Sequence, residues 1–60
     1  MEKRKINNAP SYAKGKKWIV ATKVCGDWWF WGAADDLDDC IRMCEEAPGR
    51  IIFRRTEVKL

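Results

Sequence analysis

Histidine is absent from this chain of 60 residues, and that absence excludes several kinds of chemistry. Histidine acid–base catalysis near neutral pH, Ser-His-Asp triads and Cys/His zinc sites all require an imidazole. The only serine, Ser11, lies in a charged N-terminal stretch that we expect to be mobile. We therefore predict a protein without enzymatic activity, which needs no cofactor.

Long apolar runs are missing as well. No stretch approaches the roughly 18 residues of a membrane span, and no apolar segment follows the basic N-terminus as it would in a secretory signal. The three cysteines are Cys25, Cys40 and Cys44, and an odd number argues against a disulfide framework. We expect a protein of the reducing cytoplasm that does not engage membranes, with all three thiols as small core residues.

Acidic residues are scarce at the start of the chain. Residues 1–17 hold six Lys or Arg against Glu2 alone, a net charge of +5, whereas residues 18–60 hold six against eight Asp or Glu, a net charge of −2. The first segment also lacks helical or strand periodicity. We predict a flexible basic arm over residues 1–17 and a single small domain over residues 18–60.

Aromatic residues are abundant, and four stand in a row at residues 28–31. Residues 18–25 have the β-branched and aromatic character of a strand, and a type II′ turn at Gly26-Asp27 would return the chain through residues 28–32. This hairpin sorts the side chains onto two faces. The face predicted to be the core carries Trp18, Val20, Thr22, Val24, Trp29 and Trp31, and the other carries Ile19, Ala21, Lys23, Cys25, Trp28 and Phe30.

Residues 33–47 change to helical spacing, with an apolar stripe that includes Leu37, Cys40, Ile41 and Cys44. Asp35 is the predicted cap, and Pro48-Gly49 ends the helix. Residues 50–58 are the last predicted strand. The predicted fold class is α+β, a ββαβ unit whose three-stranded, antiparallel-type sheet has the order 2-1-3 and carries one helix on one face.

Two clusters of side chains contain residue types that can bind metal ions, but we do not predict a metal site at either. The carboxylates of DDLDD spread around the helix without calcium-loop spacing, and they suit a solvated helix start near the positive end of its dipole. Cys40 and Cys44 lie one turn apart, but a metal site there would also need Cys25 and a carboxylate. No metal is predicted.

The face that a single helix leaves uncovered is the main functional signal. Large apolar patches are seldom left bare on a monomer, so we predict a protein interface there, most simply a homodimer, with Ile19, Lys23, Trp28 and Phe30 as its residues. Charged residues that could add partner contacts are Lys3, Arg4, Lys5, Lys14, Lys16, Lys17, Asp36 and Asp39. Alternatively, the arm folds back and covers this face with Ile6 and Tyr12.

Binding of single-stranded nucleic acid is a further alternative, because Trp28 and Phe30 could stack on bases while the arm meets phosphates. No nucleic-acid recognition motif supports it, and residues 18–60 are net negative.

The stretch KWIVATKVCGDWWFWGAADDLDDCIRMCEEAPGRIIFRR, residues 17–55, resembles in style the small accessory proteins of bacteriophages, some of which inhibit host defence systems. The resemblance implies a protein that acts in the host cytoplasm by binding and occluding a host protein, as an inhibitor or adaptor.

Overall fold

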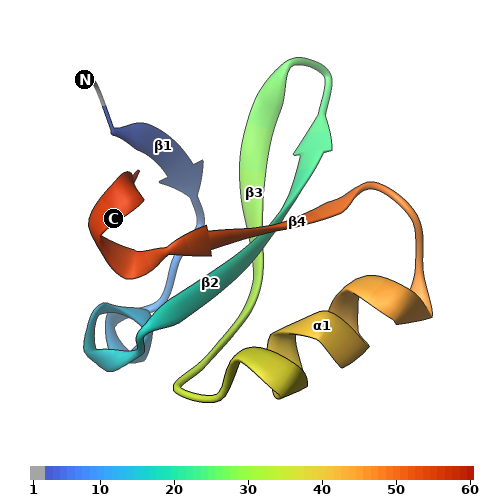
Figure 1. Cartoon of the computed structure of the whole chain (residues 1–60). Coiled ribbons are helices and arrows are strands. Elements are labelled where there is room, and N and C mark those ends of the chain that lie inside the picture. Colours follow the sequence, from blue (N-terminus) through green and yellow to red (C-terminus); the bar gives the residue numbers. More distant parts are fainter. Residues whose placement is uncertain (1–2) are drawn as a thin grey trace.

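The computed structural model describes residues 3–60 of the chain, in which one α-helix accompanies a five-stranded sheet. Figure 1 shows the helix beside the longer strands of this sheet. The chain also forms two short 3₁₀ helices, η1 and η2. The elements are β1 (Arg4–Asn7), η1 (Ser11–Gly15), β2 (Trp18–Val24), β3 (Asp27–Ala34), α1 (Leu37–Glu46), β4 (Arg50–Arg54), η2 (Arg55–Glu57) and β5 (Val58–Lys59).

The predicted α+β class with one helix is confirmed, and the predicted three-stranded sheet is part of a larger one. The strand order is β4-β2-β3-β1-β5, so the predicted order 2-1-3 survives as the β3-β2-β4 portion. The sheet is mixed, because β1 runs parallel to both β3 and β5 while β2 is antiparallel to β3 and to β4. The two added strands come from segments that were predicted to be an arm and the charged end of the last strand.

The prediction of a flexible basic arm is corrected for residues 3–17, because β1 joins the sheet and η1 packs against β3. Residues 1–2 of the predicted arm lie outside the described residues. In β1, Ile6 pairs with Trp28 of β3, and only 4% of Ile6 is exposed. In η1, Ala13 is fully buried, and the ring of Tyr12 meets Phe30 edge-on at 6.1 Å. The segment therefore covers the sheet face that was predicted to be open. This agrees with the alternative prediction, in which the arm folds back over this face with Ile6 and Tyr12.

The hairpin turn lies one residue earlier than predicted, at Cys25-Gly26, and both residues have positive φ (51° and 85°). Positive φ at both central positions is the pattern of a type I′ turn rather than type II′. Val24 now pairs with Asp27 and Lys23 with Trp28. Between the turn and Ala21 the new register moves each pairing by two residues, so these residues keep their predicted faces. Beyond a β-bulge the shift is a single residue, and Gly32, which the predicted register placed opposite Ala21, pairs with Val20 and lies on the other face.

The core was nevertheless predicted on the wrong face of the hairpin. Ile19 and Ala21 are fully buried in a cluster with Ile6, Ala13 and Val58. On the opposite face α1 covers Val20, and Gly32 leaves room for Met43, whose Sδ would lie 2.8 Å from a Cβ at that position. A β-bulge between Val20 and Ala21 leaves Trp31 without a partner on β2. Both faces thus acquire a cover, one from the N-terminal segment and one from the helix.

The connection between β4 and β5 forces the sheet to curl. Five strands laid flat would separate the outer two by about 19 Å, four spacings of roughly 4.8 Å. Arg54 and Val58 are four Cα steps apart, at most about 15 Å, and these steps pass through η2. The two edges therefore bend toward each other over the buried side chains of β1, β2 and β5.

The helix ends within one residue of the predicted limit but begins four residues later than predicted. Asp36, not Asp35, is the N-cap, and its Oδ1 accepts a hydrogen bond from the Asp38 N–H at 3.0 Å. Ala33 and Ala34, predicted as helical, belong to β3. At the other end, Arg50 Nη1 donates to the Met43 carbonyl at 2.6 Å, satisfying one of the carbonyls that a helix C-terminus leaves free.

Candidate functional site

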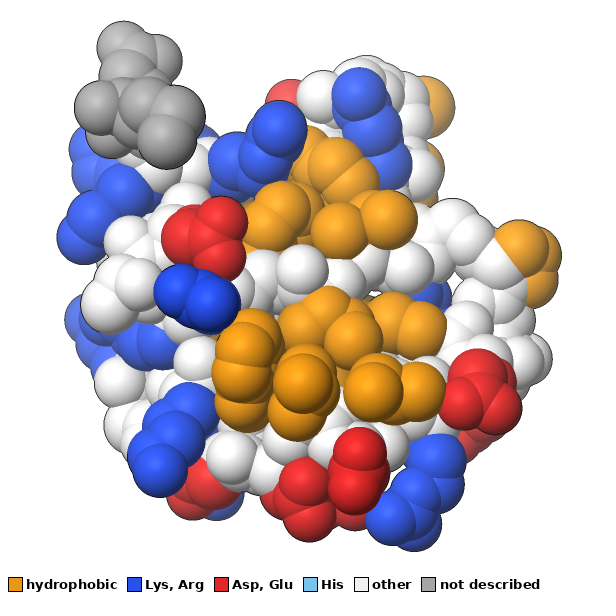
Figure 2. Space-filling view, viewed as in Figure 1, with side chains coloured by type: hydrophobic (Ala, Val, Ile, Leu, Met, Phe, Trp, Pro, Cys, Tyr) orange, Lys and Arg blue, Asp and Glu red, His pale blue; other side chains and the backbone are white. Residues whose placement is uncertain are grey.

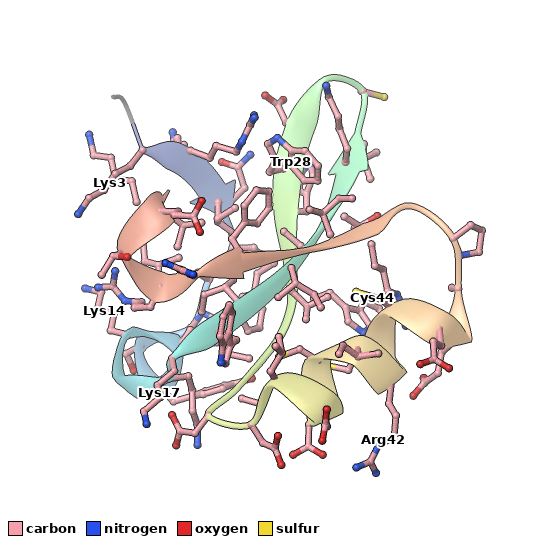
Figure 3. The ribbon with its side chains drawn as sticks, in the orientation of Figure 1. Lys3, Lys14, Lys17, Trp28, Arg42 and Cys44 are labelled. Atoms are coloured by element: carbon pink, nitrogen blue, oxygen red, sulfur yellow. The ribbon has the colours of Figure 1, made fainter. Side chains whose placement is uncertain are left out.

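A groove of about 770 Å³ opens where β1, the hairpin and η2 meet. In Figure 3 the labelled side chains of Lys3 and Trp28 lie at this end of the molecule, on the opposite side from Arg42 of the helix. The groove draws on segments that are distant in sequence. Its lining residues are Lys3, Arg4, Lys5, Lys23, Gly26, Asp27, Trp28, Phe53, Thr56 and Glu57.

Two aromatic rings form the apolar part of the groove. The rings of Trp28 and Phe53 meet edge to face at 5.1 Å, and both residues are half-buried. The guanidinium carbon of Arg4 lies 5.8 Å from each ring centroid, and Lys23 Nζ lies 5.8 Å from that of Trp28. These distances are within the range of cation–π attraction. In Figure 2 the upper group of hydrophobic side chains is flanked on both sides by Lys and Arg.

The groove carries more positive than negative charge. Lys3, Arg4, Lys5 and Lys23 supply +4, and Asp27 and Glu57 supply −2, which leaves +2. Glu57 is partly engaged, because its Oε1 accepts the Arg54 N–H at 3.2 Å. Among residues 3–60 the ion pairs are Lys16–Asp35, Arg42–Asp39 and Arg50–Glu46. None of them uses a cation of the groove, so these cations can meet an external anion.

The structure divides the four predicted interface residues. Lys23 and Trp28 lie in the groove, beside each other in register. Ile19 is fully buried and Phe30 is half-buried behind Tyr12, so neither presents the surface that an interface requires. For these two residues the prediction is corrected, because the chain's own N-terminal segment occupies that face.

The predicted charged contacts also separate. Lys3, Arg4 and Lys5 line the groove, whereas Asp36 caps the helix and Asp39 pairs with Arg42 at 3.3 Å. The remaining predicted cations, Lys14, Lys16 and Lys17, lie outside this groove, and Lys16 pairs with Asp35 at 3.8 Å.

Phe53 is the aromatic residue of the groove that sequence reasoning missed, and the other lining residues that were not predicted are Gly26, Asp27, Thr56 and Glu57. Its ring is carried by β4, which pairs with β2 so that Ile19 faces Phe53. Alternation along β4 already placed Phe53 and Ile51 on one face, and pairing with β2 would have put that face on the side of Trp28. The signal was therefore present but depended on a register that local sequence does not encode.

The cysteines behave differently from one another. Cys40 is fully buried, as predicted, whereas Cys44 is half-buried rather than part of the core, and burial raises the pKa of both thiols. The carboxylate of Asp39 and the Cys44 thiol add to the rise in the pKa of Cys40, while Arg50 opposes the rise at Cys44. Cys25 was predicted in the core and is exposed in the hairpin turn instead. Within residues 3–60, no three His, Cys, Asp or Glu side chains gather as a metal site would require.

The face predicted as the core retains exposed tryptophan. Trp29 is 40% exposed and Trp31 is 50% exposed, and Val24 is exposed beside them near the turn. The Arg50 guanidinium lies 3.8 Å over the Trp31 ring. The helix therefore covers only the part of this face around Val20.

Comparison with protein-family models, with curated proteins and with solved structures gives no match to this chain. Among residues 3–60, no helix has the length and apolar character needed to cross a membrane.

Proposed function

We propose that this is a non-catalytic binding protein whose groove holds single-stranded nucleic acid. The observation that carries the proposal is the combination of two half-exposed rings, Trp28 and Phe53, with four cations on the rim and net positive charge. Proteins that bind single strands without sequence preference pair these same elements, aromatic platforms for bases and a positive groove for the backbone.

Arg4 gives the groove a way to exchange partners. In the free protein its guanidinium lies over both rings, where cation–π attraction holds it. A base that stacks on Trp28 takes this position, and the displaced guanidinium then meets a phosphate, for which its bidentate donors are well suited. Lys23 lies against the same ring and supplies a second phosphate contact.

The predicted homodimer through Trp28 and Phe30 loses its basis, because the chain covers most of that face itself. A protein partner is a second candidate at a different place, since Trp29, Trp31 and Val24 leave apolar surface exposed. This candidate includes the host-protein inhibitor or adaptor that the resemblance to phage accessory proteins implies. That role and the cytoplasmic location stay predictions.

A matched pair of variants tests the groove. Trp28→Leu and Trp29→Leu each remove an indole from β3, but only Trp28 lines the groove. Stacking of a base on an aromatic ring is worth about 1–3 kcal/mol. In fluorescence anisotropy with a labelled oligothymidylate, we expect Trp28→Leu to weaken binding roughly 5- to 140-fold at about 1.4 kcal/mol per tenfold. Trp29→Leu should leave binding unchanged.

Charge is tested by salt. For a single strand, the slope of log K against log salt concentration is about −0.7 per neutralised phosphate, so Lys23→Gln should make the slope shallower by about that amount. Absence of binding to any single-stranded probe at low salt would refute the proposal. Equal losses in Trp28→Leu and Trp29→Leu would refute the assignment of the groove. If the wild type captures a protein and Trp29→Leu alone loses that capture, the result would favour the second candidate.

A further inference from the structure

A second groove, of about 400 Å³, lies on the other side of η2. Its lining residues are Lys16, Lys17, Trp18, Arg54, Arg55 and Thr56, so four of the six are cations and none is acidic. In the first groove four cations are offset by Asp27 and Glu57. The second groove is thus the more positive of the two, and it contains one aromatic ring where the first contains two.

The two arginines of the second groove are held in place, Arg55 by backbone carbonyls and Arg54 by the ring of Trp18. The Arg55 N–H donates to the Lys17 carbonyl at 2.9 Å, and Arg55 Nε donates to the Lys14 carbonyl at 3.3 Å. The guanidinium carbon of Arg54 lies 6.0 Å from the Trp18 ring centroid, and the two residues pair across β2 and β4. These bonds use the Arg55 Nε and leave its terminal nitrogens available to an anion, which lowers the ordering cost of binding.

The two grooves meet at Thr56, which lines both. They also share the end of β4, where Phe53 contributes a ring to the first groove and the next residue, Arg54, contributes a cation to the second. Consecutive strand residues point to opposite faces, so β4 and η2 form a ridge with a basic, aromatic groove on each side. A chain-like ligand that leaves one groove over Thr56 enters the other.

We propose that one nucleic-acid strand crosses this ridge, with bases stacked on Trp28 and Phe53 and the continuing backbone bound by Lys17, Arg54 and Arg55. This inference rests on the proposed function and adds a division of labour to it. The first groove supplies the rings on which bases stack, together with its own phosphate contacts, and the second groove adds contacts to the phosphates that follow. It follows that ligand length matters, because a strand long enough for only one groove makes no use of Arg54.

The test compares Arg54→Gln with Arg42→Gln, which removes the same charge from the exposed surface of α1 and lies in neither groove. The backbone N–H of Arg54, which donates to Glu57, is kept in the variant. The probes are labelled oligothymidylates of about 4 and about 16 nucleotides, the range that small single-strand-binding folds cover. Lys17→Gln is a second variant of the same groove.

For the longer probe, Arg54→Gln and Lys17→Gln should each weaken binding and reduce the salt slope by about 0.7, whereas Arg42→Gln should change neither. For the shorter probe all three variants should bind like the wild type. If the wild type binds but Arg54→Gln and Lys17→Gln bind the longer probe normally, the second groove is not part of the path and the inference fails while the first groove stands. If Arg54→Gln loses equal affinity for both probes, or if Arg42→Gln loses as much affinity as Arg54→Gln, the effect is one of net charge in general. Either result would also overturn the inference. If the wild type binds neither probe, the proposed function itself fails.

Discussion

Truncating Ile6 to alanine should remove a large part of the free energy of unfolding of this small protein. Ile6 is 4% exposed and belongs to the buried cluster with Ile19 and Val58, on a strand that joins β3 to β5. Ile→Ala in a core costs about 2–5 kcal/mol. A chain of 60 residues has about 3–9 kcal/mol in total, so the loss is at least a fifth of the whole and can exceed half. The midpoint of thermal unfolding should fall by at least about 8 °C, at roughly 4–8 °C per kcal/mol.

Circular dichroism on heating and in urea measures this loss, with Ile6→Val and Lys5→Ala as companions. Ile6→Val should cost about 0.5–1.5 kcal/mol. Lys5→Ala changes an exposed residue of the same strand and should stay within about 0.5 kcal/mol. A chain that begins at Lys16 should be destabilised at least as much as Ile6→Ala. If Ile6→Ala and the shortened chain both melt within a few degrees of the wild type, β1 does not pack as described and the first groove loses three of its four cations.

Two other predictions concern the helix and the thiols. Arg50→Met removes the hydrogen bond to the Met43 carbonyl and the stacking on Trp31, from a side chain that is 12% exposed. It should cost about 1.5–3 kcal/mol in urea unfolding, and a cost near zero would contradict this role. With a thiol reagent, Cys25 should react at once, and Cys40 and Cys44 only after denaturant is added. Because burial raises the pKa of Cys40 and Cys44, the unfolded chain ionises first, so stability should be complete below about pH 8.5 and decline at higher pH. Equal labelling rates for the three thiols, or stability that does not decline at alkaline pH, would contradict this placement.

The sequence predicted what depends on neighbouring residues and failed where distant segments pair. The helix followed from its apolar stripe. The faces of the hairpin were right from Ala21 to Phe30 although the turn was misplaced, since the register there moved by an even number of residues. The position of the turn was missed because Cys25 has a φ of 51°, a conformation that non-glycine residues seldom adopt. β1 could not be foreseen, since RKIN has one apolar residue and its partners lie more than 20 positions away.

The same limit explains the partial success at the groove. Trp28 and Lys23 were identified together because they share a face of one hairpin, which alternation alone decides. The assignment of core and surface failed for a physical reason. Lys23 marked its face as the polar one, yet a lysine at the end of a strand can extend beyond the covered region while Ile19 and Ala21 on the same face are sealed by β1 and η1. A charged side chain near a strand end therefore indicates that this end is exposed, but it does not indicate which face of the sheet is buried.

The anchoring of β1 bears on how salt dependence should be interpreted. Arg4 and Ile6 are two residues apart in β1 and therefore share a face, which puts the guanidinium over the rings and the isoleucine in the core. Apolar burial and strand pairing hold this segment, since none of the ion pairs among residues 3–60 involves Lys3, Arg4 or Lys5. Added salt screens the repulsion among these neighbouring cations over a distance of about 10 Å at 0.1 M, and so it does not release the strand. A thermal transition that stays constant while affinity for a single strand falls would assign the salt effect to the bound phosphates. A transition that falls in parallel with affinity would instead show that β1 is held by charge, contrary to the packing of Ile6.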